Sequence, residues 1–209
     1  MVAIDSNWRK LFFLLFLLII TNLIVSELAF YCIDFGQDDS LKNFSSFFKK
    51  IKFFYVNYLT NIFIKPIKTF SVAILLSLGA FFYDIKQKLK EFWISVIIAE
   101  FIFLISSISE ICWFYFKNEY SINEVQTFYP LSIINFFNYD QVDFFLIYPL
   151  QQLNLFQILN WGVLIFLINK QLGKQNKKRL GFKLVLLIYL PVWVLWMLSI
   201  LLINLTGSV

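Results

Sequence analysis

The stretch that decides the fold is FWISVIIAEFIFLISSISEICWFYF, residues 92–116. It is longer than the roughly 20 apolar residues that a helix needs to cross the hydrocarbon of a bilayer. Two carboxylates, Glu100 and Glu110, lie within it. The stretch predicts a transmembrane helix, and it raises the question of what two acidic side chains do inside one.

The composition of the whole chain is that of a membrane protein. Of 209 residues, 60% are hydrophobic and only 15% are charged, against about a quarter charged in soluble domains. We therefore expect one all-α integral membrane domain over residues 1–209, with no separate soluble domain. The net charge of +5 does not indicate a nucleic-acid partner, because Lys and Arg gather at the ends of apolar runs, where membrane topology uses them.

Five apolar segments are candidate spans: residues 10–32, 66–84, 92–116, 150–169 and 183–205. The first follows two basic residues and shows no small-x-small cleavage site, so we expect an uncleaved span. Segment 66–84 is short, and it either crosses fully or is re-entrant. That choice decides on which side of the membrane the N-terminus lies. Pro191 should kink the last span, because proline removes a backbone donor and clashes with the preceding turn.

The distribution of Lys and Arg orients the second half of the chain. The basic segments 86–90 and 170–183 are expected inside, and the acidic loop 117–149 outside. The composition, rich in Phe, Ile, Lys and Asn, is typical of an AT-rich bacterial genome, so we expect a bacterial inner membrane protein.

Residues 44–64 have a different pattern from the spans. Large apolar side chains recur at helical spacing, while lysine, serine and asparagine fall mostly on the other side. This pattern predicts an amphipathic helix that lies in the membrane interface. The alternative is a sixth span, which would bury three lysines at about 3 kcal/mol each.

A short sequence motif occurs twice in the second half of the chain. Tyr129, Pro130 and Leu131 are repeated as Tyr148, Pro149 and Leu150, and each copy is followed by an Asn and a Phe at matching positions. Proline fits the first turn of a helix. The repeat therefore predicts two helices that begin at the outer interface, a short one over 130–138 and a long one that becomes the fourth span. An alternative is that the repeat forms a docking surface for a partner.

This region resembles the Yip1-domain family of multi-pass membrane proteins. The matching residues are Pro130, Leu131, Ser132, Asn154, Leu155, Phe156, Trp161 and Gly173. The resemblance covers about residues 66–205; Asn154 stands where the family often has Asp, and span 10–32 is an addition. It implies a helical membrane protein without catalysis. In eukaryotes the family acts in vesicle trafficking with small GTPases, a partner that a bacterium would lack.

Glu100, Ser107 and Glu110 form the candidate intramembrane site. With Ser106, they share one arc of about 120° on a helical wheel at about 100° per residue. Ionisable groups in a bilayer are expensive and are candidates for function. They either carry protons or cations, or they join helices by hydrogen bonds. Glu27 and Asn160 are the polar partners that we consider.

Several function classes lack the residues that they need. The chain has no His and only two Cys, Cys32 and Cys112, without metal-ligand spacing. We therefore expect no catalytic residues, no metal and no cofactor. The favoured hypothesis is a non-catalytic membrane protein whose partners are the lipid bilayer and an unknown membrane protein. The alternative is a small transporter or channel component that uses Glu100 and Glu110.

Overall fold

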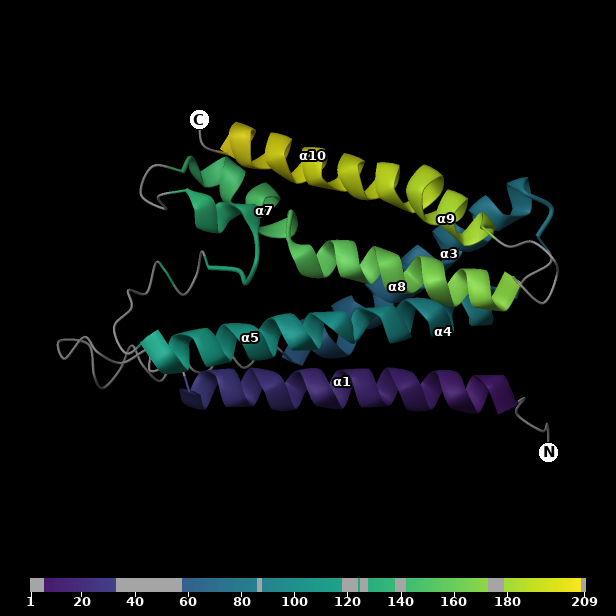
Figure 1. The fold of residues 1–209 in the computed structure, drawn as a ribbon, viewed down its shortest axis with the longest axis horizontal. Helices are drawn as coiled ribbons and strands as arrows, with labels where there is room; N and C mark the ends of the chain where they lie inside the picture. The colour runs from purple at the N-terminus through teal and green to yellow at the C-terminus, as the bar shows by residue number, and fades with distance from the viewer. Residues whose placement is uncertain are drawn as a thin grey trace.

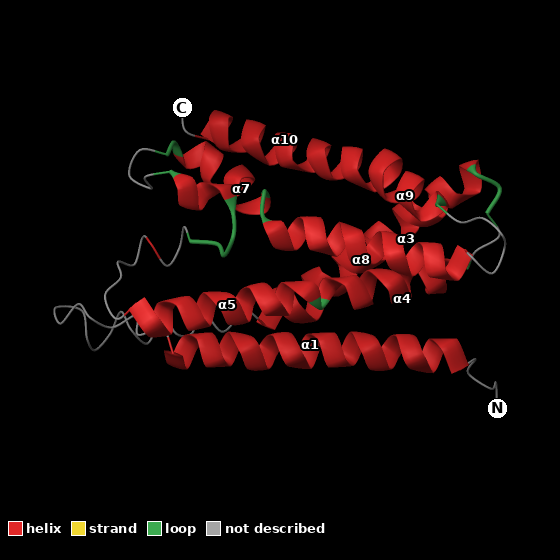
Figure 2. Cartoon of the chain, in the orientation of Figure 1, coloured by secondary structure: helices red, strands yellow, loops and turns green. Residues whose placement is uncertain are grey.

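The protein is an integral, multi-pass membrane protein built from helices, as the sequence predicts. A computed structural model describes residues 6–32, 58–85, 88–117, 124, 128–137, 142–172 and 179–207. Within these ranges every regular element is a helix (Figure 2). Five helical stretches are long and apolar enough to cross a membrane: Asn7–Ala29, Thr60–Phe82, Leu89–Lys117, Leu155–Leu172 and Leu180–Thr206.

The spans alternate in direction along the long axis of the molecule (Figure 1). They are α1 (Ser6–Cys32), η2 with α3 (Thr60–Ile64, Lys65–Phe82), α4 with α5 (Leu89–Glu100, Ile102–Lys117), α8 (Leu155–Leu172), and α9, η6 and α10 (Leu180–Leu184, Val185–Tyr189, Leu190–Gly207). The start of α1 lies at the end where α3 turns into α4 and α8 into α9. The end of α10 lies at the opposite end, with α7 (Phe144–Gln152) and η3 (Ile133–Phe136).

Residues 60–82 form one helix that is long and apolar enough to cross a membrane, which favours the full crossing over the re-entrant alternative at this position. The expected interfacial helix 44–64 lies outside the described residues up to position 57, and its last residues belong to this span. Pro66 does not begin the helix. A π-helical turn, Thr60–Ile64, precedes it and lets the helix continue. Proline is tolerated in such helices when local π adjustments replace its missing hydrogen bond.

The last span also contains a π-helical turn just before a proline. The π-helical turn Val185–Tyr189 ends two residues before Pro191, as Thr60–Ile64 ends two residues before Pro66. The missing backbone donor and the clash expected at Pro191 are therefore accommodated by the π-helical turn on its N-terminal side. Tyr189, at the end of that turn, is buried.

Helix α4 lies at the centre of the bundle. One side of it carries Phe92 and Val96, which pack in the main apolar cluster with residues from α3, α8, α9 and η6. The other side carries Ile94 and Ile97, which pack against Leu11 of α1. Because α4 contacts neighbours on both sides, a polar residue on it is held inside the protein and away from lipid.

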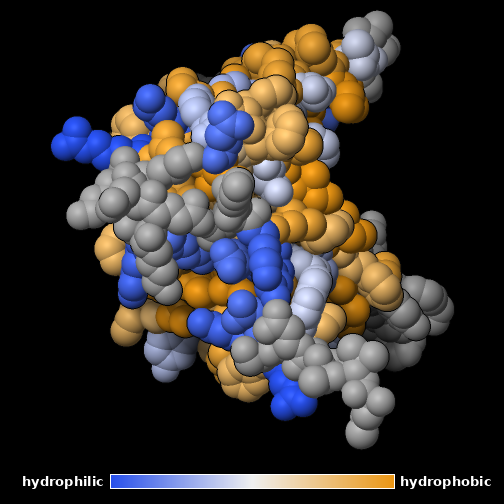
Figure 3. All heavy atoms as spheres, turned by 90° about the vertical axis from the view of Figure 1, so that its right-hand side faces the viewer, coloured by the Kyte–Doolittle hydropathy of each residue, from blue (hydrophilic) through white to orange (hydrophobic). Residues whose placement is uncertain are grey.

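Hydrophilic side chains gather on the end face that carries the start of α1 (Figure 3). The flanks of the same view show apolar atoms. This division fits a bundle whose flanks face hydrocarbon and whose end faces water and headgroups. The described residues of the two basic turns that we expected inside, 88–90, 170–172 and 179–183, lie at this end.

A close contact joins α8 to α9 at Gly181. Its N–H donates to Asn169 Oδ1 at 2.9 Å, and a Cβ at this position would lie 2.9 Å from the carbonyl oxygen of Ile165. Backbone cannot move aside as a flexible side chain can. Only glycine therefore fits here without separating the two helices. Gly162, on α8, has no atom within 4 Å of a Cβ built on it.

Gly181→Ala should lower stability by about 1–3 kcal/mol, because overpacking forces the backbone of α8 to shift. The matched control, Gly162→Ala, should be neutral or stabilising by up to about 1 kcal/mol, since alanine is the better helix former. Thermal unfolding in mild detergent measures both. Equal effects of the two variants would show that α8 and α9 do not approach as described.

Candidate functional site

The candidate site begins at a break in the third span. Helix α4 ends at Glu100 and α5 begins at Ile102. Across the break the backbone makes short-range hydrogen bonds, from Phe101 N to Ile98 O at 3.3 Å and from Leu104 N to Phe101 O at 3.1 Å. The break leaves Glu100 at the C-terminal end of α4, inside the span, with 7% of its surface exposed.

Glu100 is paired with Lys68 of α3. Lys68 Nζ lies 3.1 Å from Glu100 Oε1, and the side chains are 49% and 8% exposed, respectively. The same ammonium lies 5.2 Å from the centre of the Phe103 ring, one turn further along. Such a cation–π contact adds a second attraction for the charge. The carboxylate that the sequence singled out is thus neutralised within its own chain.

A second lysine of α3 is also held inside the bundle. Lys65 donates to Asn22 Oδ1 of α1, while Asn22 Nδ2 donates to Leu18 O at 2.7 Å. Lys65 is also within electrostatic reach of Glu100. Both lysines therefore lie within the span-length helix Thr60–Phe82, and they tie it to both α1 and α4.

Glu27, considered as a partner for the third span, lies elsewhere. Its carboxylate accepts a hydrogen bond from the Tyr58 hydroxyl at 3.2 Å. This bond and the carboxylate's charge raise the pKa of Tyr58 above its usual value. Asn160, the other candidate, is buried on α8.

A polar track leads from the ion pair toward the outer end. The side chains of Ser106 and Tyr129 lie within reach of each other, and Tyr129 is within electrostatic reach of Glu110, Lys68 and Glu100. Burial raises the pKa of Tyr129, so its hydroxyl stays protonated at neutral pH and can donate. Tyr129, from the repeated phrase, therefore connects the two carboxylates that the sequence placed on one arc.

Ser107 does not join this track. Its hydroxyl donates to Phe103 O of its own helix at 3.2 Å, whereas Ser106 is the buried serine that meets Tyr129. The helical wheel assumed one uninterrupted helix. The tighter turn at Phe101 changes the rotation between α4 and α5, so positions beyond the break no longer keep the phase of an ideal helix.

Two buried donors on α8 face the ring of Tyr189. The Tyr189 hydroxyl lies close to the side chains of Gln157 and Trp161, yet neither Gln157 Nε2 nor Trp161 Nε1 makes a hydrogen bond of ordinary geometry. Gln157 is only 4% exposed. Trp161 is fixed by an edge-to-face contact with Trp193 at 5.2 Å. An unsatisfied buried donor is costly, so this corner of the bundle holds hydrogen-bonding capacity that is unused.

The two copies of the repeated phrase bind each other at the end of the bundle that carries α7 and η3. Ser132 and Asn154 form an isolated antiparallel bridge. Ile133 N donates to Leu153 O at 3.0 Å, and Leu155 N donates to Leu131 O at 3.1 Å. Leu131 adopts a left-handed conformation with φ of 55°. The repeat is therefore an intramolecular clasp between the loop before η3 and the start of α8.

The expectation that Pro130 and Pro149 each begin a helix is wrong. Pro130 is buried in a turn, and the short helix is the 3-10 turn Ile133–Phe136. Pro149 lies inside α7, and the fourth span begins at Leu155. The residue that begins α8 is Asn154, whose Oδ1 accepts a hydrogen bond from Gln157 N at 2.8 Å. Tyr148 and Leu150 lie half-buried on α7.

The chemistry that the described residues offer is hydrogen bonding and charge pairing. They hold no group of three or more His, Cys, Asp or Glu that could bind a metal ion. The cluster around Lys68 and Glu100 can bind or move protons and can hold a small polar group. No protein family model, curated protein or solved structure matches the chain.

Asn154→Ala should destabilise the protein by about 1 kcal/mol, because it removes the N-terminal cap of α8. Asn154→Ser should retain most of the stability, since serine also caps well. Midpoints of thermal unfolding in detergent measure the difference. If the serine variant lost as much as the alanine variant, the side-chain cap would not be what holds the clasp.

The Lys68–Glu100 pair should show strong coupling in a double-mutant cycle. Glu100→Gln alone leaves the Lys68 charge unpaired and should lower stability by roughly 1–3 kcal/mol, a value discounted for the half-exposed lysine. Lys68→Met combined with Glu100→Gln removes both charges and should recover most of that loss. Additive single effects, measured by unfolding in detergent, would mean that the pair does not hold α3 against α4.

Proposed function

We propose that this chain is a non-catalytic membrane protein that works through contacts with lipid and with a membrane-protein partner. The observation that carries the proposal is the Lys68–Glu100 pair. Glu100, the carboxylate deepest in a span, already has its counter-charge in the same chain. A pair that joins α3 to α4 serves helix packing, which is the role that intramembrane polar groups have most often.

The outer surface of the bundle supports a partner in the membrane. Helix α10 is exposed along most of its length, and of its large apolar side chains Met197 is the one that is buried. Trp196, Leu202 and Ile203 are each at least 60% exposed. Such a helix contacts lipid or a neighbouring span. A Yip1-like role as a subunit of a complex in a bacterial inner membrane agrees with the resemblance noted in the sequence and with the lack of catalytic chemistry there.

A second candidate function, a small transporter or channel component, is favoured by the polar track. Glu100, Tyr129, Ser106 and Glu110 form a row of groups within electrostatic or hydrogen-bond reach. Among the described residues, no Lys or Arg forms an ion pair with Glu110. Glu110 is half-buried, and a carboxylate that is partly removed from water without a counter-charge can exchange a proton, which a row of hydroxyls can pass on.

Purification of the tagged protein from its host membranes in mild detergent, followed by mass spectrometry, tests the first function. We expect one membrane protein at stoichiometric amounts. The double variant Lys68→Met with Glu100→Gln should retain this partner, because it keeps the helices packed without the charges. A homogeneous wild-type protein without any partner would overturn the proposal.

Proton flux into liposomes tests the second function with variants of its own. A scaffold should show no flux above empty liposomes in the wild type. A carrier should show flux that is lost in Glu110→Gln, while the variant stays inserted and folded. Ser199→Ala, an exposed hydroxyl on α10 that bonds to its own helix, is the matched control and should change neither readout.

A further inference from the structure

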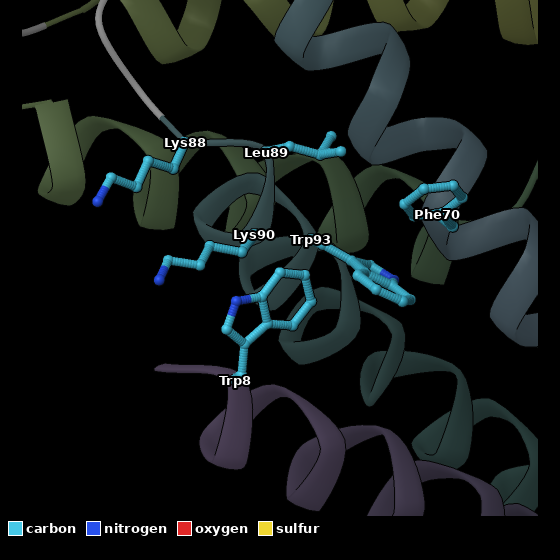
Figure 4. A pocket seen from close by; sticks show the side chains of 6 residues that line it. All are labelled: Trp8, Phe70, Lys88, Leu89, Lys90 and Trp93. Atoms are coloured by element: carbon cyan, nitrogen blue, oxygen red, sulfur yellow. The ribbon is translucent and has the colours of Figure 1, made fainter. Parts of the chain in front are cut away.

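A pocket lies at the end of the bundle that carries the basic turns, between α1, α3 and α4. It has a volume of about 290 Å³ and is lined by Trp8, Phe70, Lys88, Leu89, Lys90 and Trp93. Figure 4 shows the six side chains around it. Its residues take no part in the Lys68–Glu100 cluster, so the pocket is a separate site.

The pocket has a cationic side and an aromatic side. The ammonium groups of Lys88 and Lys90 extend to the same side, away from the ring of Phe70 (Figure 4). Lys90 Nζ lies 6.0 Å from the centre of the Trp8 ring. The ring of Phe70 contacts that of Trp93 at 4.8 Å. The chemistry thus changes from charged to apolar within one small cavity.

The aromatic side is held rigidly in place. Trp93 Nε1 donates to Thr69 Oγ1 at 3.1 Å, which fixes the indole against α3. Trp8 stacks on Phe12 with ring centres 6.1 Å apart. Rings that are fixed before a ligand arrives lose little conformational freedom when it binds. The walls are therefore preformed.

One lining residue of the pocket, Phe70, belongs to an apolar stripe of α3. Ile67, Phe70, Ile74 and Leu78 recur at helical spacing on one face, and each is at least 38% exposed. In a bilayer this stripe lies along the acyl chains, since it follows the length of a spanning helix. A ligand in the pocket can therefore have a charged group at the lysines and a long apolar part along α3.

We propose that this pocket binds one anionic phospholipid of the inner leaflet. The phosphate group lies between Lys88 and Lys90, Trp8 sits at the headgroup level, and an acyl chain follows Phe70 and the α3 stripe. Charge complementarity favours an anionic lipid over a zwitterionic one, because two cations at the interface attract negative headgroups. Tryptophan is the residue that is enriched at this depth of a membrane. The site is independent of the proposed function.

Native mass spectrometry of the purified full chain tests the site. The protein is presented with an equimolar mixture of phosphatidylglycerol and phosphatidylcholine that carry the same acyl chains. We expect one bound phosphatidylglycerol per chain, in roughly 25-fold excess over phosphatidylcholine, since each of the two lysines near an anionic lipid contributes about fivefold. Equal binding of the two lipids by the wild type would overturn the proposal, whatever the variants do.

Two double variants separate this site from general electrostatic attraction. Lys88→Gln with Lys90→Gln should lose the excess of phosphatidylglycerol. Lys170→Gln with Lys183→Gln removes two exposed charges at the same end of the bundle and should keep it. Equal loss in both variants would show that only the net charge matters, and would contradict a built site.

Two further outcomes would assign the pocket to another occupant. Displacement of the lipid by soluble glycerol phosphate at millimolar concentration would mean that the lysines bind a free phosphate group and that the acyl chain adds nothing. A dimer without lipid, seen in the same spectra, would mean that a second copy of the chain covers the pocket. Either result would overturn the lipid site.

Discussion

The bundle depends on the attraction between one ammonium and one carboxylate inside a spanning helix pair. A charge far from water costs several kcal/mol, so Lys68 and Glu100 stay together only if α3 and α4 remain packed. Small side chains, Ala73 on α3 and Ala99 on α4, lie in the same buried cluster and allow the two helices to approach. Charge pairing and small-residue packing thus support the same interface between α3 and α4. Because α4 also packs against α1 and α8, this interface helps to fix the positions of those two helices.

The class of protein and most of the spans could be predicted from the sequence, because apolar length alone decides whether a helix can cross a bilayer. The importance of Glu100 could be predicted for a similar reason. Its partner could not. Lys68 lies inside the candidate span 66–84, but nothing in the sequence indicates that it meets Glu100, because the approach of α3 to α4 is a tertiary contact.

The outer clasp was missed for a related reason. Pro149 has the pattern of a first-turn proline, yet it lies inside a short helix, and Asn154 begins the span. A cap of this kind is visible in the sequence as Asn three residues before Gln157. The pairing of Ser132 with Asn154 has no such signal, because it joins residues 22 positions apart through backbone atoms. Local rules indicate which residues can begin a helix, and tertiary contacts decide which of them does.

The two π-helical turns also bear on how this sequence can change. A π-turn contains one residue more than an α-helix would place there, so each is the mark of a single inserted position. Deleting one residue from Val185–Tyr189 would restore an unbroken α-helix and would leave the helix beyond in nearly the same rotational phase, because the wide turn already absorbs the rotation of the extra residue. Trp193 would then still meet Trp161, whereas the same deletion within the α-helical part of α10 would rotate everything beyond it by about 100°. Each π-helical turn is therefore a position at which a spanning helix can gain or lose a residue without exchanging its lipid-facing and inward-facing sides.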